Sequence, residues 1–129
     1  MGEQTRKELR DIGLKNRREV LGNAYVDKAL NNITDFNRKF QDLLNEYCWG
    51  ACWGSAGLTR KERSMVVLGI LTALGKSQEV TVHTRGALNN GLTEQQIAEV
   101  FLQAAIYCGV PAAVDSFRAA GPVIAEKNA

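Results

Sequence analysis

Residues 59–75, TRKERSMVVLGILTALG, decide the fold of this chain. Thr59 followed three residues later by Glu62 is the capping box that begins many helices. The apolar run from Met65 to Leu74 follows directly, and Gly75 can end the helix in the left-handed conformation. The stretch therefore predicts a helix that is apolar on nearly every side. A chain of this size has few places to cover such a helix, so we also expect self-association.

Helix signals of the same kind recur along the rest of the chain. Apolar residues return at helical spacing, and Pro111 suits the first turn of a last helix. Gly13 is expected to weaken the first helix, and the glycines between 50 and 57 predict a loop lined by Trp49 and Trp53. The helix-start signals are Thr5 with Glu8, Thr34-Asp35, Ser77, and Thr93 with Gln96.

Only residues 79–83, EVTVH, could compete as a β-strand, and the preceding Ser77 together with the spacing of Val80, Thr84 and Ala87 favours a helix there. We therefore predict an all-α orthogonal bundle of about six to seven helices. At 129 residues, the chain is expected to form a single domain, 1–129.

The composition excludes several classes of function. The net charge is only +2, and basic residues alternate with acidic ones, so the sequence predicts no nucleic-acid partner. No apolar run approaches the roughly 20 residues of a membrane-spanning helix. The first residues are charged and hold no apolar signal core, which predicts a cytoplasmic location.

His83 is the only histidine, and Glu79 stands four residues before it on the same predicted helix. A carboxylate one turn away can orient an imidazole and favour its protonated form, as general acid–base catalysis requires. The alternative interpretation is an ion pair on the surface of the helix.

Aromatic and charged residues elsewhere are candidates for binding a substrate. Trp49 and Trp53 could form the wall of an apolar pocket, or belong to the core. Tyr25 and Glu46 are weaker candidates. An arginine could hold a carboxylate through two parallel hydrogen bonds or could simply be solvated. The arginines considered are Arg17, Arg18, Arg60, Arg63 and Arg85.

The three cysteines are expected to be reduced thiols. Cys48 and Cys52 are separated by three residues, which differs from the Cys-x-x-Cys spacing of a redox pair. With Cys108 and His83 they do not make a convincing set of four zinc ligands. The sequence therefore predicts no metal site.

Segments along nearly the whole chain resemble the carboxymuconolactone decarboxylase family, within the alkyl hydroperoxidase D-like superfamily. The resemblance implies that superfamily's all-helical fold, assembly as a homotrimer or homohexamer, and a cofactor-independent decarboxylase. The segments are Arg17-Arg18-Glu19-Val20-Leu21-Gly22, Phe40-Gln41, Trp49-Gly50 with Trp53, Gly57-Leu58, Arg63-Ser64, Ala73-Leu74-Gly75, His83 with Arg85 and Gly91, and 107–112 (YCGVPA).

The resemblance also implies a substrate and a site. The substrate would be 4-carboxymuconolactone or a related carboxylated lactone from protocatechuate (beta-ketoadipate) catabolism. His83, oriented by Glu79, would donate the proton, Arg85 or Arg63 would hold a carboxylate, and Trp49 with Trp53 would exclude water.

This chain departs from both branches of the superfamily. The decarboxylases that it resembles have a histidine and an arginine where it has Tyr25 and Ser55, which implies an altered substrate or lost activity. The hydroperoxidases have two cysteines where it has Lys76 and Glu79, and a glutamate at Ser64. A thiol peroxidase and a noncatalytic oligomeric binding protein remain as alternatives.

Overall fold

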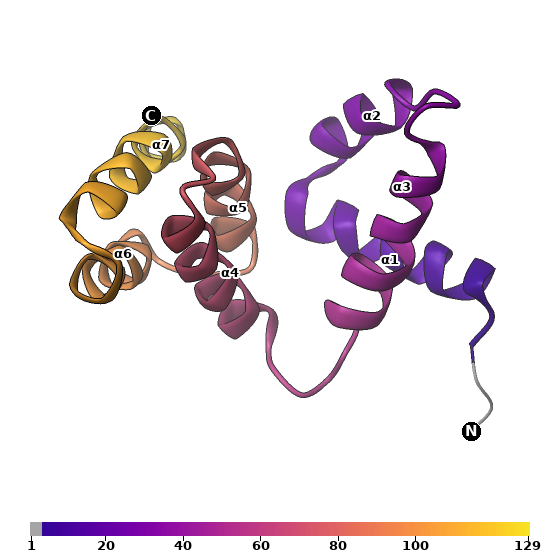
Figure 1. Ribbon diagram of the computed structural model, residues 1–129, viewed down its shortest axis with the longest axis horizontal. Coiled ribbons are helices and arrows are strands. Elements are labelled where there is room, and N and C mark those ends of the chain that lie inside the picture. The colour runs from indigo at the N-terminus through magenta and orange to yellow at the C-terminus, as the bar shows by residue number, and fades with distance from the viewer. Residues whose placement is uncertain (1–3) are drawn as a thin grey trace. The chain divides into compact units, whose positions relative to one another are not determined.

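The computed structural model describes residues 4–129, and the described chain is helical, without a β-strand (Figure 1). It confirms the prediction of an all-α chain with the alkyl hydroperoxidase D-like fold. The contacts divide the chain into two compact units, Met1–Leu58 and Thr59–Ala129. The single domain 1–129 stays a prediction, and its residues 1–3 lie outside the described residues.

The first unit is built around the packing of its first helix on its last. Thr5 caps the first helix, because its hydroxyl accepts a hydrogen bond from the Glu8 backbone N–H. The third helix continues directly into a π-helix, in which the turns are wider than in an α-helix. The elements are α1 (Arg6–Leu21), α2 (Asn23–Asn31), α3 (Arg38–Leu43) and the π-helix η1 (Leu44–Cys52).

Gly13 does not weaken α1, contrary to our expectation. The helix runs through it unbroken, and the backbone of η1 passes so close that a side chain at Gly13 would collide with the Asn45 carbonyl. Gly50 meets the Leu9 carbonyl of α1 in the same way. The two glycines are therefore the place where the two helices touch.

The predicted loop around the tryptophans is also wrong. Trp49 lies within η1, Trp53 follows its last residue, and both side chains are buried. Burial along this segment falls on Asn45 and Glu46, then on Trp49 and Gly50, then on Trp53. This repeat of four residues suits the wider turns of a π-helix and keeps the buried side chains on one face.

The second unit consists of four helices around one apolar core. The core cluster consists of buried residues from α4 to α7, including the loop residue Leu92. The helices are α4 (Arg60–Leu74), α5 (Ser77–Asn89), α6 (Glu94–Cys108) and α7 (Val110–Asn128). The cluster comprises Leu68, Val80, Ala87, Leu92, Ile97, Phe101 and Ala120.

Most of the predicted helix boundaries in this unit are confirmed. Thr59 with Glu62 and Thr93 with Gln96 form complete capping boxes, and Gly75 ends α4 at a φ of 70°. Residues 79–83 are helical. Ser77 is the first residue of α5 and not its cap. In the first unit, Thr34-Asp35 is not a cap either, because α3 begins at Arg38 after Asn37.

Hydrogen bonds from buried and partly buried hydroxyl groups link the helices of the second unit. The hydroxyls of Thr72 in α4 and Ser116 in α7 lie 2.7 Å apart, and the Thr81 hydroxyl donates to the Ala119 carbonyl at 2.9 Å. These bonds link α4 and α5 to α7 and so fix the helix that carries His83. None of the helices in residues 4–129 is long and apolar enough to cross a membrane.

Candidate active site

His83 lies in the middle of α5, with only 9% of its surface exposed. Burial lowers the pKa of His83 from 6.5 to about 4, because a charged imidazolium loses more hydration than a neutral ring does. In the unliganded protein at pH 7 the ring is therefore neutral.

Burial, and not Glu79, sets the direction of the His83 pKa shift, and the role of Glu79 in orienting the ring stays a prediction. Glu79 was expected to favour the protonated ring, but its side chain is exposed on the first turn of α5 and burial dominates the His83 pKa. The surface position that the ion-pair interpretation gave to His83 is wrong, since the histidine is buried.

Arg85 points away from His83, as residues two apart on a helix do. Its guanidinium Nη2 donates to Glu126 Oε2 in α7 at 3.0 Å, and both side chains are largely exposed. A substrate carboxylate bound by Arg85 would have to compete with Glu126. The structure therefore does not bring Arg85 and His83 together.

Arg63 is partly buried near the start of α4, beside the buried Ser64. The Ser64 hydroxyl accepts a hydrogen bond at 2.9 Å from the side-chain amide of Asn90, which follows the last residue of α5. Asn90 also donates to the Arg60 carbonyl at 3.4 Å. These bonds join the start of α4, where Arg63 lies, to the end of the helix that carries His83.

In the first unit, Trp49 and Trp53 form a stacked pair. Their ring centroids lie 5.0 Å apart at an interplanar angle of 24°. The Asn16 side-chain amide in α1 donates to the Trp49 carbonyl at 2.9 Å, which ties the indole pair to α1. Tyr25, on α2, is partly buried. The indoles therefore make a fixed apolar surface.

Glu46 is completely buried in η1, and each of its carboxylate oxygens meets a different arginine of α1. Arg10 Nη1 lies 3.0 Å from Oε1, and Arg6 Nε lies 3.2 Å from Oε2. A carboxylate paired in this way is suited to holding α1 against η1. Arg6 and Arg10 were not among the sequence-based candidates.

Arg17 continues the line of arginines on α1 and is nearly as buried as Glu46. Its Nη1 donates to Gln41 Oε1 at 3.0 Å and to Asn45 Oδ1 at 3.2 Å. A signal for this face was present in the sequence, because Arg6, Arg10, Gly13 and Arg17 follow the spacing of a single helical stripe. No sequence pattern indicated that Asn45 and Gln41 would be the hydrogen-bond partners of Arg17.

The thiols do not assemble into a recognisable cofactor site. Cys52 and Cys108 are exposed and Cys48 is partly buried. Within residues 4–129, no group of three or more histidine, cysteine, aspartate or glutamate side chains is arranged to hold a metal ion.

The sequence matches known proteins over most of its length. Residues 38–121 match the model of the carboxymuconolactone decarboxylase family. A nitrosuccinic acid decarboxylase from Metarhizium robertsii is 44% identical over 88% of this chain and 80% of its own length. A 4-carboxymuconolactone decarboxylase from Acinetobacter baylyi is 41% identical over 78% of this chain and 75% of its own.

The family match spans parts of both units, and two decarboxylases with different named substrates align with most of the chain. The chain belongs to the carboxymuconolactone decarboxylase family. It is therefore a carboxy-lyase, and the predicted reaction class is confirmed.

Proposed function

We propose that this protein removes a carboxyl group from a carbon atom that lies next to an electron-withdrawing group, without a cofactor. The observation that carries the proposal is the pair of decarboxylase relatives, one named for nitrosuccinic acid and the other for 4-carboxymuconolactone. In both acids, the electrons left by carbon dioxide can move onto an oxygen, of a nitro group or of a conjugated carbonyl. The preferred substrate is 4-carboxymuconolactone or a related acidic lactone of aromatic catabolism.

The proposed reaction has two chemical steps. First the bond between the ring carbon and its carboxylate breaks, and the electron pair moves through the conjugated double bond onto the lactone carbonyl, giving a dienolate and carbon dioxide. A proton is then added to carbon. The protein must stabilise the enolate oxygen and supply that proton, and the electrostatic contribution is expected to be the larger.

His83 is the proposed proton donor, and its burial requires a step before the chemistry. The ring is neutral at pH 7, since its pKa is about 4. A bound anion close to an imidazole raises its pKa, so a substrate with a negative charge would let His83 take up a proton from water. His83 would then pass that proton to carbon, and one proton is consumed for each carbon dioxide released.

Other residues have supporting roles in this proposal. Arg63, partly buried near the start of α4 next to the bonds that join it to the end of α5, is the preferred partner for a substrate carboxylate, and Arg85, exposed and paired with Glu126, is the alternative. Trp49 and Trp53 form their stacked pair in the other unit, and their role in excluding water stays a prediction from the family resemblance. Glu79, exposed on the first turn of α5 and one helical turn before His83, is proposed to orient the imidazole.

The test is turnover of the two acids by the purified protein, with ultraviolet absorbance following the lactone and released carbon dioxide following both. His83→Ala should lower turnover by roughly a hundredfold to ten-thousandfold, the usual contribution of a positioned acid or base. His83→Gln retains a hydrogen-bond donor but cannot protonate carbon. Its turnover should therefore exceed that of His83→Ala only by the contribution of enolate stabilisation. Gln78→Ala, exposed on the same helix, is the matched control.

The pH dependence tests the protonation step separately. Because kcat/KM reports the unliganded protein, it should fall about tenfold per pH unit above the His83 pKa of about 4. Because kcat reports the complex, in which the His83 pKa is raised, it should stay level to a higher pH. Full turnover by His83→Ala would overturn the role of His83. No turnover of either acid would overturn the proposed substrate.

A further inference from the structure

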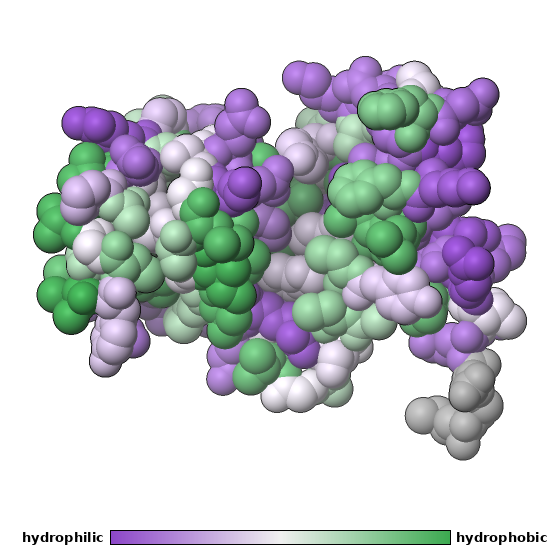
Figure 2. All heavy atoms as spheres, viewed as in Figure 1, coloured by the Kyte–Doolittle hydropathy of each residue, from purple (hydrophilic) through white to green (hydrophobic). Residues whose placement is uncertain are grey.

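The helix α4 has a polar start and an apolar remainder. Its first five residues, 60–64 (RKERS), all carry polar side chains, whereas residues 65–74 (MVVLGILTAL) are apolar apart from Thr72. Hydrophobic side chains cover the region of α4 in the space-filling view (Figure 2). A cation on α4 that could hold a substrate carboxylate therefore has to come from the first five residues.

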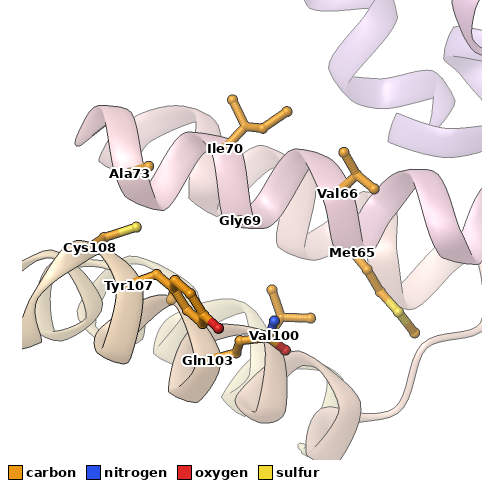
Figure 3. A pocket seen from close by; sticks show the side chains of 10 residues that line it. Met65, Val66, Gly69, Ile70, Ala73, Val100, Gln103, Tyr107 and Cys108 are labelled. Atoms are coloured by element: carbon orange, nitrogen blue, oxygen red, sulfur yellow. The ribbon is translucent and has the colours of Figure 1, made fainter.

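The cavity between α4 and α6 does not contain the proposed site. It has a volume of about 520 Å³, and the residues that line it are uncharged. Figure 3 shows Val66, Gly69 and Ile70 of α4 beside it. Neither Arg63 nor His83 belongs to its lining. The proposed carboxylate site depends instead on how the start of α4 lies against α5, the helix that carries His83.

Asn90 holds the start of α4 against the end of α5. Its side-chain amide donates to the buried Ser64 hydroxyl at 2.9 Å and to the Arg60 carbonyl at 3.4 Å. The amide has two hydrogens, so it can serve both acceptors at once. Arg60 and Ser64 lie one helical turn apart, and Arg63 lies in the turn between them. Asn90 therefore holds both ends of the turn that carries Arg63.

The residue after Asn90 brings the two helix ends closer still. Gly91 has a φ of 96°, in the left-handed region that side chains other than glycine rarely adopt. A Cβ added at Gly91 would lie 2.9 Å from Cε of Lys61. The side chain of Lys61 therefore lies against the backbone that ends α5. The first turn of α4 is thus packed on this end of α5 as well as hydrogen-bonded to it.

His83 and Asn90 lie on the same side of α5. They are seven residues apart, which is close to two helical turns and about 10 Å along the helix. Gly86 and Ala87, which lie between them on this side, are buried. The joint at Asn90 therefore fixes α4 relative to the side of α5 that carries His83.

We propose that Asn90 is a positioning residue for the decarboxylation: it fixes the turn of α4 that carries Arg63, and so determines where a substrate carboxylate is held relative to His83. This inference rests on the proposed function, in which Arg63 binds that carboxylate. The long side chain of an arginine has many conformations, and a fixed backbone limits where its guanidinium can lie. Asn90 acts through Arg63 and does not touch the reacting atoms.

The first test compares Asn90→Ala with the unmodified protein in steady-state turnover. Without Asn90 the turn can leave its binding position, and the lost bond shifts this equilibrium by no more than its own net free energy. KM should therefore rise roughly threefold to tenfold. The value of kcat should stay within about twofold, because His83 still protonates a substrate that has bound. Ser64→Ala removes the acceptor of the same bond, so its effect should not add to that of Asn90→Ala.

A variant of Arg63 separates positioning from general damage. In an Arg63→Gln background, Asn90→Ala should leave KM unchanged, because the arginine through which Asn90 acts is absent. Ser116→Ala is the matched control, since it breaks the buried contact of 2.7 Å between the Thr72 and Ser116 hydroxyls at the other end of α4. It should lower the melting temperature without changing KM. Circular dichroism should show the same helix content in all variants.

Binding of succinate measures the carboxylate site without turnover. Succinate has two carboxylates but no group that could take up the electrons left by carbon dioxide. Calorimetric titration should give a Kd that rises in Asn90→Ala by the same factor as KM, and that does not depend on residue 90 in the Arg63→Gln background. Succinate binding in this pattern without turnover of either acid would refute the proposed function and support the role of Asn90.

Three results would overturn the positioning role alone. They are an unchanged KM and Kd in Asn90→Ala, an equal rise when Asn90→Ala is added to Arg63→Gln, and an equal rise in Ser116→Ala. An unmodified protein that neither binds succinate nor turns over either acid would overturn both this inference and the proposed function.

Discussion

The Glu46 carboxylate is completely buried in η1, and Arg10 of α1 reaches it with Nη1 at 3.0 Å from Oε1. Arg10 itself is about one-third exposed, so its charge keeps part of its hydration while that of Glu46 has none. The two partners therefore differ in what happens when the ion pair is broken. Water can hydrate the Arg10 guanidinium but not the buried Glu46 carboxylate, so the stability of the fold depends on an arginine beside Glu46.

The asymmetry predicts a rescue. Replacing both Arg6 and Arg10 by alanine should lower the free energy of unfolding by about 3 kcal/mol, because the Glu46 charge is left buried without its two cations. Adding Glu46→Gln to that double variant should recover much of the loss, since a neutral amide costs less to bury. Urea denaturation at pH 7, followed by circular dichroism, measures all three proteins. The absence of any recovery would mean that the arginines act through packing.

Arg63 and Arg85 should differ in their effect on substrate binding. Arg63→Gln is expected to raise KM at least tenfold, because it removes the proposed partner of the substrate carboxylate. Arg85→Gln should change KM less than twofold and stability by less than about 1 kcal/mol, as is usual for an exposed ion pair. Initial rates over a range of lactone concentrations decide between them. A larger effect at Arg85 would restore it as the substrate-binding arginine.

The buried histidine should make stability depend on pH. The unfolded chain binds a proton at His83 below about pH 6.5, and the folded chain only below about pH 4. Between these values the unfolded state holds more protons, so the free energy of unfolding falls as the pH is lowered, by up to about 3 kcal/mol from this group. Chemical denaturation at pH 7 and pH 4 measures the change. His83→Gln should lack this component, and an equal loss in that variant would assign it to other groups.

Two glycines in helix interiors should respond in opposite ways to alanine. Gly13→Ala should destabilise the first unit by about 3 kcal/mol or more, because the new methyl group collides with the backbone of η1. Gly69→Ala should stabilise α4 by roughly 0.5–1 kcal/mol, since its Cβ meets open space and alanine favours a helix. Thermal unfolding of both variants provides the comparison. If Gly13→Ala stabilised the protein as much as Gly69→Ala does, α1 and η1 would be able to move apart at no cost in stability.

The thiols should be dispensable for decarboxylation. Replacing Cys48, Cys52 and Cys108 together by alanine should leave turnover within about twofold, because no cysteine has a role in the proposed chemistry. Some stability should be lost at the partly buried Cys48. Peroxide consumption, assayed in parallel with a dithiol reductant, should be absent from the unmodified protein. Peroxide reduction that disappears with Cys48 or Cys52 would favour the thiol peroxidase alternative.

Local signals predicted the second unit well. The capping boxes at Thr59 and Thr93 and the glycine at Gly75 act through neighbouring residues only, so their sequence pattern was enough to place helix ends. The lone histidine was likewise visible in the sequence. Its low pKa was not, because burial depends on residues that are distant in the chain.

In the first unit, local sequence signals did not predict the features that depend on contacts between distant residues. The glycines between 50 and 57 indicated a loop, yet Gly50 lies inside η1 because α1 needs a close approach there. A π-helix has no short sequence signature, since its wide turns are stabilised by what packs against them. The burial of Glu46 was equally hidden, because its two partners lie 36 and 40 residues away.

The wide turns of η1 also place a limit on how this segment can change in evolution. A π-helix spends more residues per turn than an α-helix, so loss of one residue between Leu44 and Cys52 would allow ordinary turns to form over the same span. Six α-helical residues at about 100° each turn the chain about as far as seven residues of wider turns do, so Glu46 and Trp53 would keep nearly the same relative directions. A loss that spares the buried Glu46, Trp49 and Gly50 could be accommodated in this way, whereas a second loss would leave too few residues for the span.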